Sequence, residues 1–254
     1  MEASTPIVRM ILPYSGLAFA YDQALGVPFF LGVRRAFEGL VRRYGVSFRS
    51  AADLGCGTGL FARYLSRCWR VRVFAVDRSI EMLEKAARNG CGSDVVLLRQ
   101  DIRCLRLPKR VDLVTANFDT VNHLLSGEDI RQAFRRIADN LMPGGHFIFD
   151  VLTHCQHMDS RRTYVRHFRT KQCQVAQKIR WHPSRRALSV MIVQRCALCG
   201  PTTIEAHRER AYTPIELGRT LREAGFEIRG VHDATTLRPA TQCVPRLLIV
   251  ARKR

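Results

Sequence analysis

A chain of 254 residues in which 46% are hydrophobic can bury a full core, and it lies near the upper size limit for one domain. It contains no apolar run of the roughly 18 to 20 residues that a membrane span requires, and its first residues lack the apolar core of a signal peptide. We therefore expect one domain over residues 1–254, a cytoplasmic location and no membrane partner.

The chain is strongly basic, with a formal charge of +19. A basic surface attracts polyanions through the release of counterions. Between 151 and 200, ten Arg or Lys residues stand against one acid, Asp159. There is no continuous basic block and no arginine–aromatic repeat that would stack single-stranded bases. The charge therefore leaves two alternatives open, a polyanionic partner and a solvated basic face.

Nine cysteines are scattered along a chain that is too large to need disulfides, so we expect reduced thiols. Cys196 and Cys199 have the spacing of metal ligands, and His154, Cys155 and His157 are further candidates. A structural zinc site needs four ligands, however, and a second CxxC or HxxxH pair is missing. We expect no metal.

Two helical patterns come first in the chain, at 14–25 and 27–45, and the second ends at Gly45 as a helix C-cap would. A strand at 49–54 leads into the glycine-rich sequence ADLGCGTGLF. Helices are then predicted at 60–69, 79–90 and 126–145, and strands at 71–77, 94–101, 110–119 and 146–153. Strands that alternate with helices in this way predict a parallel, doubly wound α/β sheet.

The alternation changes after residue 153. Segments 174–181, 187–195 and 203–213 show the polar and apolar alternation of antiparallel strands. A helix capped by Thr213 and two strands, at 226–233 and 246–253, complete the earlier rhythm. The fold class is therefore α/β, with a doubly wound, seven-stranded, mostly parallel sheet and a small antiparallel β insertion.

The glycine-rich loop has the spacing GxGxG at Gly55, Gly57 and Gly59, between a strand and a helix. Glycine allows close approach of the backbone, and the helix N-terminus offers free N–H groups. Asp53 before the loop would repel a pyrophosphate but would hold a cation. S-adenosylmethionine (SAM) fits, because it lacks phosphates and carries an ammonium and a sulfonium. Asp77, at the end of the next strand, can accept both hydroxyls of a ribose.

Five segments in order over residues 50–152 resemble the class I SAM-dependent methyltransferases: ADLGCGTGLF, AVDRSIEMLEKA, RQDIR, VDLVTANFD and LMPGGHFIFDV. YSGLAFAYD, NFDTVNHLL and HRERAYTPIELGRTLREAGF resemble a bacterial subgroup that includes the amino-sugar N-methyltransferases. The resemblance implies a Rossmann-like methyltransferase fold, a helical lid at 1–45, and an antiparallel insertion at 155–211 over the substrate pocket.

The same resemblance implies roles for individual residues. The three loop glycines pass beneath the methionine and ribose of SAM, and Asp53 lies near its amino group. Asp77 binds the ribose hydroxyls. The other cofactor-binding residues are Arg78 beside the adenine, Asp101 and Ile102 at the adenine amine and ring, Asn117 and Phe118 on the methionine side, and Tyr21 in the lid.

Methyl transfer is an in-line displacement at an activated carbon, so the protein mainly aligns the nucleophile and excludes water. A base is needed when the nucleophile arrives protonated. His123 falls where the amino-sugar enzymes place an active-site histidine, and its ordinary pKa suits proton uptake near neutrality; the alternative is a histidine that caps a short helix. Tyr14 is the second catalytic candidate, as a group that positions the substrate. Asp119 is a weaker candidate for holding a cationic amine, and strand packing accounts for His207 and Arg208.

The sequence thus predicts a SAM-dependent methyltransferase that acts on a nitrogen or oxygen of a small molecule. Dense arginine between 161 and 186 favours an anionic substrate. The alternatives are a methyltransferase for RNA or another macromolecule, and a SAM-binding regulator without turnover. No NPPY tetrapeptide and no suitably placed cysteine support the best-known nucleic-acid mechanisms, and the GxGxG spacing disfavours a nicotinamide dehydrogenase. The oligomeric state is not indicated.

Overall fold

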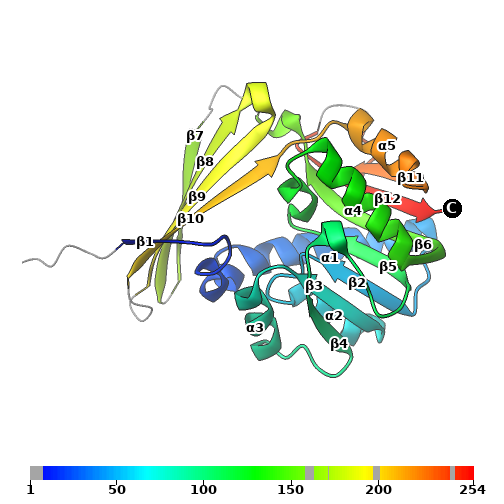
Figure 1. Cartoon of the computed structure of the whole chain (residues 1–254), viewed down its shortest axis with the longest axis horizontal. Helices are drawn as coiled ribbons and strands as arrows, with labels where there is room; N and C mark the ends of the chain where they lie inside the picture. The colour runs from blue at the N-terminus through cyan, green and yellow to red at the C-terminus, as the bar shows by residue number, and fades with distance from the viewer. Residues whose placement is uncertain (1–7, 158–162, 171, 197–200, 241–243) are drawn as a thin grey trace, which may run out of the picture.

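A seven-stranded sheet forms the centre of the computed structural model, which describes residues 8–157, 163–170, 172–196, 201–240 and 244–254 (Figure 1). Its strand order is β11-β12-β6-β5-β2-β3-β4. The strands are β2 (Ser50–Leu54), β3 (Arg72–Asp77), β4 (Val95–Arg99), β5 (Val111–Ala116), β6 (Leu141–Leu152), β11 (Phe226–Asp233) and β12 (Arg246–Lys253). Strands β2 to β6 pair in parallel, and β12 is antiparallel to both β6 and β11. The predicted seven-stranded, mostly parallel sheet is confirmed.

Helices cover both faces of this sheet. On one face lie α1 (Val27–Tyr44), α2 (Leu60–Trp69) and α3 (Ile80–Arg88), and on the other α4 (Gly127–Asn140) and α5 (Pro214–Glu223). Phe37 and Phe61 anchor the first layer, and Phe134 and Leu217 anchor the second. Each side chain of this size stabilises the fold by about 1.5–3 kcal/mol through burial. The doubly wound arrangement is confirmed.

Residues after β6 form a second sheet, of five strands in the order β1-β10-β9-β8-β7. The strands are β1 (Val8–Ile11), β7 (Thr163–Arg169), β8 (Cys173–His182), β9 (Ala187–Cys196) and β10 (Thr202–Arg210). Strands β7 to β10 are antiparallel, as the alternation from 174 onward predicted. The sequence pattern did not reveal β7, whose residues are mostly exposed on both faces.

The N-terminal segment lies where the two sheets meet (Figure 1). It begins as β1, which pairs in parallel with β10, so residues 8–11 are not helical as the lid at 1–45 implied. The four residues of β1 are too few to form a stable helix by themselves. The edge of β10 offers them backbone hydrogen-bond partners as a strand. Two short helical turns follow, η1 (Leu17–Phe19) and the π-helical η2 (Asp22–Gly26), before α1.

Helix boundaries follow the predicted caps closely. Ser79, Ser126 and Thr213 each accept a backbone N–H at the start of α3, α4 and α5. Helix α4 ends at Asn140, earlier than the predicted 145, because Pro143 lacks an N–H group and Gly144 has φ +77°. The remaining short helices are η3 (Ile102–Cys104), η4 (Thr120–His123), η5 (His154–His157) and η6 (Pro183–Arg185).

Among the described cysteines, Cys173 and Cys196 depart from the expectation of reduced thiols. Cys173 and Cys196 lie directly opposite each other on β8 and β9, with Cα atoms 4.1 Å apart, and form a disulfide. Strand register brings them together across 23 residues, which composition alone does not reveal. Cys199, the other half of the CxxC motif, lies outside the described residues. Within the described ranges, no three His, Cys, Asp or Glu side chains are grouped as metal ligands.

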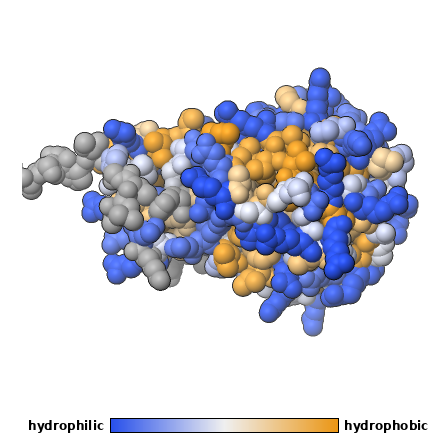
Figure 2. Space-filling view, turned by 90° about the horizontal axis from the view of Figure 1, so that it is seen from below, coloured by the Kyte–Doolittle hydropathy of each residue, from blue (hydrophilic) through white to orange (hydrophobic). Residues whose placement is uncertain are grey.

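Hydrophilic residues dominate the outer parts of the face shown in Figure 2, and hydrophobic residues gather nearer its middle. No helix among the described residues has the length and apolar character needed to cross a membrane.

Replacing the fully buried Phe134 by alanine is expected to lower the free energy of unfolding by about 3–5 kcal/mol, because the cavity lies in the core between α4 and the sheet. Ile215→Ala is the control, since Ile215 is 83% exposed on α5 and should change stability by less than about 0.5 kcal/mol. Urea unfolding followed by circular dichroism measures both. Equal effects of the two substitutions would contradict the assigned core.

Candidate functional site

The glycine-rich loop joins β2 to α2 with three left-handed residues. Gly55, Gly57 and Gly59 have φ angles of +63°, +52° and +80°. A Cβ at Gly55 would lie 2.1 Å from Thr120 Oγ1, and one at Gly59 would lie 2.6 Å from Cys91 Sγ. A Cβ at Gly57 would meet nothing within 4 Å. Packing therefore requires two of the glycines, and the third leaves open space where a ligand can approach the backbone.

Asp77 connects this loop to the end of β3. Its carboxylate accepts the backbone N–H groups of Gly57 at 2.8 Å and Ser79 at 2.9 Å. Burial raises the pKa of Asp77, and the two N–H donors oppose that change. The carboxylate is thus oriented by the loop, with remaining acceptor capacity toward the cavity beside it.

A cavity of about 300 Å³ opens at the carboxyl ends of the parallel strands. Ten of the thirteen predicted site residues line it: Tyr14, Tyr21, Gly55, Gly57, Asp77, Arg78, Asp101, Ile102, Phe118 and His123. The sequence did not identify the other lining residues, which are Met82, Gln100, Arg103, Thr120, Leu124, Leu125 and Asp129. Several of these are apolar, and an apolar wall with few polar groups is typical of a small-molecule site.

Three predicted residues, Asp53, Gly59 and Asn117, are not part of the cavity lining. Asp53 is 2% exposed and accepts the hydroxyl of Thr115 at 2.8 Å, and burial raises its pKa to about 7. Gly59 packs against α3. Asn117 is buried at the end of β5, and its amide Nδ2 has no hydrogen-bond partner in the described part of the chain. The next residue in the chain, Phe118, lines the cavity, so this donor is close to the cavity in sequence.

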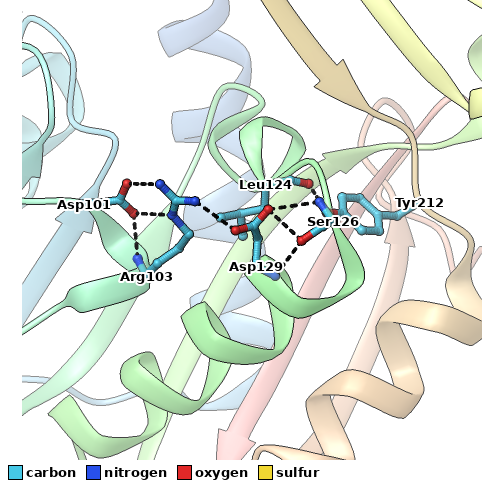
Figure 3. Close-up of polar contacts among 6 residues, drawn as sticks. All are labelled: Asp101, Arg103, Leu124, Ser126, Asp129 and Tyr212. Carbon is cyan, nitrogen blue, oxygen red and sulfur yellow. Dashed lines mark hydrogen bonds and ion pairs between the residues drawn. The ribbon is translucent and has the colours of Figure 1, made fainter.

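Figure 3 shows how the wall of this cavity is held where η3 meets the start of α4. Arg103 binds both carboxylate oxygens of Asp101, at 3.0 and 2.7 Å, and donates to Asp129 at 2.8 Å. Asp129 also forms a capping box with Ser126. Hydrogen bonding from Arg103 lowers the pKa of Asp101, so this carboxylate stays ionised with most of its acceptor capacity already used.

The N-terminal segment is attached to the second sheet by one buried carboxylate. Glu205 on β10 accepts the backbone N–H groups of Tyr14 at 2.6 Å, Gly16 at 2.7 Å and Leu17 at 2.6 Å. His207 donates to the same carboxylate at 3.0 Å. Glu205 is 2% exposed, so these donors replace the water it has lost. Sequence reasoning missed Glu205, although a carboxylate at an inward position of an alternating strand was a usable signal.

A second contact attaches the N-terminal segment to the glycine loop. Asp22 in η2 accepts the hydroxyl of Thr58 and the side-chain amide of Asn89, the latter at 2.9 Å. The same amide donates to the carbonyl of Thr58 at 3.0 Å. The segment therefore connects the second sheet to the glycine loop, and its Tyr14 and Tyr21 line the first cavity.

Tyr14 and His123 meet at the boundary of this cavity, with the Tyr14 hydroxyl 2.7 Å from His123 Nε2. His123 Nδ1 lies 3.3 Å from the carbonyl of Arg208, which can only accept, so Nδ1 carries the proton and Nε2 accepts from Tyr14. Burial, and then the neighbouring His207, lower the pKa of His123 to about 4. The expectation of proton uptake near neutrality is therefore wrong for His123, which is also the last residue of η4.

A second cavity, of about 210 Å³, adjoins the first. Tyr14, Tyr21 and Phe118 line both. Its roof is the inner face of β7 to β10, with Tyr164, Ile179, Leu188, Val190 and Ile192 as an apolar wall. At its base Phe118 and Asp119 have left-handed φ angles of +59° and +64°. Such backbone strain costs on the order of 1–3 kcal/mol per residue and is concentrated at functional sites.

Charged groups at the base of the second cavity form a cluster. Arg246 Nη1 contacts Asp119 Oδ1 at 2.7 Å and also pairs with Asp150. Burial raises the pKa of Asp150 to about 6 and that of Glu209 to about 8. The positive charge of Arg246 is thus matched by two carboxylates, and Glu209 stands beside this pair.

The dense arginine between 161 and 186, from which an anionic substrate was predicted, mostly does not line the second cavity. Of the basic residues between 161 and 186 that the structure describes, Arg166 lines the second cavity. The exposed basic side chains of this sheet include Arg169, Lys178, Arg180, Arg195 and Arg208, each at a position that alternates with the inward-facing residues. Arg161 and Arg162 lie outside the described residues. His207 lies on the inner face, where its ring packs 4.6 Å from that of Tyr14.

The central part of the chain is similar to known proteins. Residues 51–145 match the model of a methyltransferase domain. A dTDP-3-amino-3,6-dideoxy-alpha-D-glucopyranose N,N-dimethyltransferase of Streptomyces fradiae is 33% identical over 106 residues, which are 42% of this chain and 40% of that protein. The chain spans about two fifths to three fifths of the length of the first curated relatives that it matches.

Solved structures match over nearly the whole chain. A SAM-dependent methyltransferase of Clostridium acetobutylicum has a TM-score of 0.80 at 22% identity, and the match covers 94% of this chain and 98% of that one. The CcbJ methyltransferase of Streptomyces caelestis has a TM-score of 0.77 at 24% identity, with coverage of 94% and 97%. At these identities the likeness establishes the fold, which includes the five-stranded sheet as well as the matched domain.

Glu205→Gln is expected to loosen the N-terminal segment, because the amide has one acceptor oxygen and would turn an NH₂ group toward a backbone N–H. Losing charge-assisted hydrogen bonds should speed amide hydrogen exchange at Tyr14, Gly16 and Leu17 by about tenfold or more. Glu227→Gln, on the surface of β11, is the control. Unchanged exchange in Glu205→Gln would show that the carboxylate does not hold the segment.

His123 should remain neutral between about pH 5.5 and 8 in the folded protein, since its pKa is lowered to about 4. Titration of the imidazole signals by NMR, assigned by comparison with His123→Gln, measures this directly. Because the unfolded histidine titrates near 6.5, acid favours the unfolded chain, and stability present above pH 6.5 is lost as the pH falls toward 4. An imidazole titration centred near 6.5 would contradict the assigned tautomer and environment.

Proposed function

We propose that this chain, in which residues 51–145 match the model of a methyltransferase domain, is an enzyme that transfers the methyl group of SAM to a nitrogen or oxygen of a small molecule. One observation carries the proposal: two adjoining cavities share Tyr14, Tyr21 and Phe118 as a common boundary. The first has residues that SAM would need, and the second combines an apolar wall with a few charged groups, as small-molecule sites do.

The residues of the first cavity fit SAM. Asp77 is oriented to accept the ribose hydroxyls, and the space beside Gly57 admits the ligand close to the backbone. Met82 and Ile102 would pack on the adenine. The Asn117 amide, which has no partner among the described residues, would donate to the methionine part from behind the lining. Asp53 and Gly59 would act from behind the cavity lining, by charge and by helix packing. When bound, SAM supplies a methyl group that its sulfonium has already activated.

The protein's own contribution is alignment and exclusion of water. The N-terminal segment, held by Glu205 and Asp22, covers the cofactor cavity, so bulk water is kept from the boundary between the cavities. The Tyr14 hydroxyl donates a hydrogen bond to His123, which leaves the phenolic oxygen lone pairs to accept an N–H or O–H of the substrate. Phe118 and Tyr21 confine the reacting atom beside it. Such positioning supplies a large part of the rate enhancement in methyl transfer.

The second cavity favours an amine as the methyl acceptor. Asp119 and Glu209 are carboxylates that can attract an ammonium, and the S. fradiae relative is named for an amino sugar. Arg166 lines the same cavity and offers a partner for an anionic group elsewhere on the substrate. We therefore extend the proposal to a small amine that can also carry a negative charge.

Asp77→Asn is expected to weaken SAM binding by about tenfold or more, because a charge-assisted bidentate contact is replaced by a neutral amide. Asp94→Asn is the control, since Asp94 is exposed in the loop before β4 and does not line the cavity. Isothermal titration calorimetry with SAM measures both variants. Equal affinities would contradict the assigned cofactor site.

The reaction itself is tested with radiolabelled SAM and a desalted lysate of the source organism, with and without ribonuclease, followed by separation by size. We expect label in the small-molecule fraction, reduced in Asp77→Asn at limiting SAM. Label in a large, ribonuclease-sensitive fraction would favour an RNA substrate bound by the exposed basic side chains. SAM binding without transfer to any fraction would favour a SAM-binding regulator.

A further inference from the structure

Glu209 is a carboxylate in the second cavity with which no described residue pairs. It belongs to the inward row of β10, which reads Glu205, His207, Glu209. The first two already form hydrogen bonds: Glu205 accepts from the N-terminal segment, and His207 donates to Glu205. Glu209 has no hydrogen bond or ion pair with any described residue. Resting on the function proposed above, we infer that Glu209 holds the ammonium group of the substrate and takes up its proton before the methyl group is transferred.

No described cation forms an ion pair with Glu209. The groups that share its cavity are Asp119 at the start of η4, Arg246 on β12, Tyr164 and Arg166 on β7, Tyr14 of the N-terminal segment and His207 on its own strand. Of the two arginines, Arg246 is already paired with Asp119 and Asp150, and Arg166 lies over the ring of Tyr164. A partly buried carboxylate without a paired cation is stabilised by a cation that the ligand brings.

A second unsatisfied group points to a ligand in the same cavity. The side-chain oxygen of Gln177 is buried and has no hydrogen-bond partner in the described part of the chain. Gln177 lies on β8 opposite Arg166 and, through Ile192 of β9, in register with Glu205. The inward face therefore presents an unpaired acceptor near its middle and a carboxylate at one end, with apolar side chains between them. A small molecule with an amine and further hydroxyl groups matches this pattern.

The proton step is a transfer between two heteroatoms. The N–H bond of the ammonium breaks, an O–H bond forms on the Glu209 carboxylate, and the electron pair of the N–H bond stays on nitrogen as the lone pair of the nucleophile. Nothing is oxidised or reduced, and the proton passes to solvent after the product leaves. His123 is unsuited to this step, because its Nε2 lone pair is used by Tyr14 and its pKa is about 4. Glu209, whose pKa burial raises to about 8, is matched to an amine near neutral pH.

Proton linkage gives this inference a test that does not depend on turnover. With a pKa of about 8, Glu209 is mostly protonated at pH 7 when the cavity holds no amine. To bind an ammonium, Glu209 must lose this proton and become a carboxylate, while the ammonium keeps its charge. Binding should therefore release close to one proton to the buffer. Above pH 8 the carboxylate is already ionised, and the release should disappear.

The experiment is calorimetric titration of the whole chain with cyclohexylammonium chloride, in the presence of S-adenosylhomocysteine, in phosphate and in Tris buffer. The probe stays charged throughout, because an alkylamine has a pKa of about 10.4. We expect release of close to one proton at pH 7 and little at pH 9.5. Glu209→Gln should bind about tenfold more weakly or worse, with no linked proton. Glu223→Gln, on the exposed side of α5, should behave as the unmodified chain.

Three results would overturn the inference: no binding of the probe by the unmodified chain, binding without proton release, or unchanged affinity in Glu209→Gln. These results are separable from the fate of the proposed function. Label in the small-molecule fraction together with amine binding that ignores Glu209 would keep the methyltransferase and discard this role. Proton-linked binding through Glu209 without methyl transfer to any fraction would keep Glu209 as the amine-binding group and discard the methyltransferase.

Discussion

One carboxylate joins the two halves of the molecule. Glu205, buried on the inner face of the five-stranded sheet, collects three backbone N–H groups from the segment that precedes α1. Because a buried charge is costly unless such donors surround it, the segment can lie in few other places. Its position brings Tyr14 to His123 and places Tyr14 and Tyr21, with Phe118, at the boundary of both cavities. Asp22 of the same segment binds Thr58 in the glycine loop.

Local signals were sufficient to predict most of the central sheet. Strand rhythm, caps at Ser79, Ser126 and Thr213, and the GxGxG loop depend on neighbours within a few residues, and they led to a correct fold class. The attachment through Glu205 joins atoms 188 to 191 residues apart, and the disulfide between Cys173 and Cys196 depends on strand register. Neither can be deduced from spacing in one sequence.

The electrostatics of the candidate site differ from those of the whole chain. A formal charge of +19 suggested an anionic partner, yet the exposed basic side chains of the second sheet alternate with an inward row that carries Glu205 and Glu209. Alternation of side chains along a strand separates these two faces. The expected pKa of His123 was also wrong. Burial and the neighbouring His207 lower this pKa, and neither effect can be seen in the sequence. Charge counts describe a surface, and the chemistry of a cavity depends on which side chains face it.

Two cavities that meet at Tyr14, Tyr21 and Phe118 are the basis for assigning methyl transfer to a small molecule. The most direct test is a crystal structure of the chain with S-adenosylhomocysteine. We predict that the ribose lies against Asp77 and that the sulfur faces the boundary with the second cavity. A nucleoside bound elsewhere, or a sulfur directed away from that boundary, would contradict the assignment.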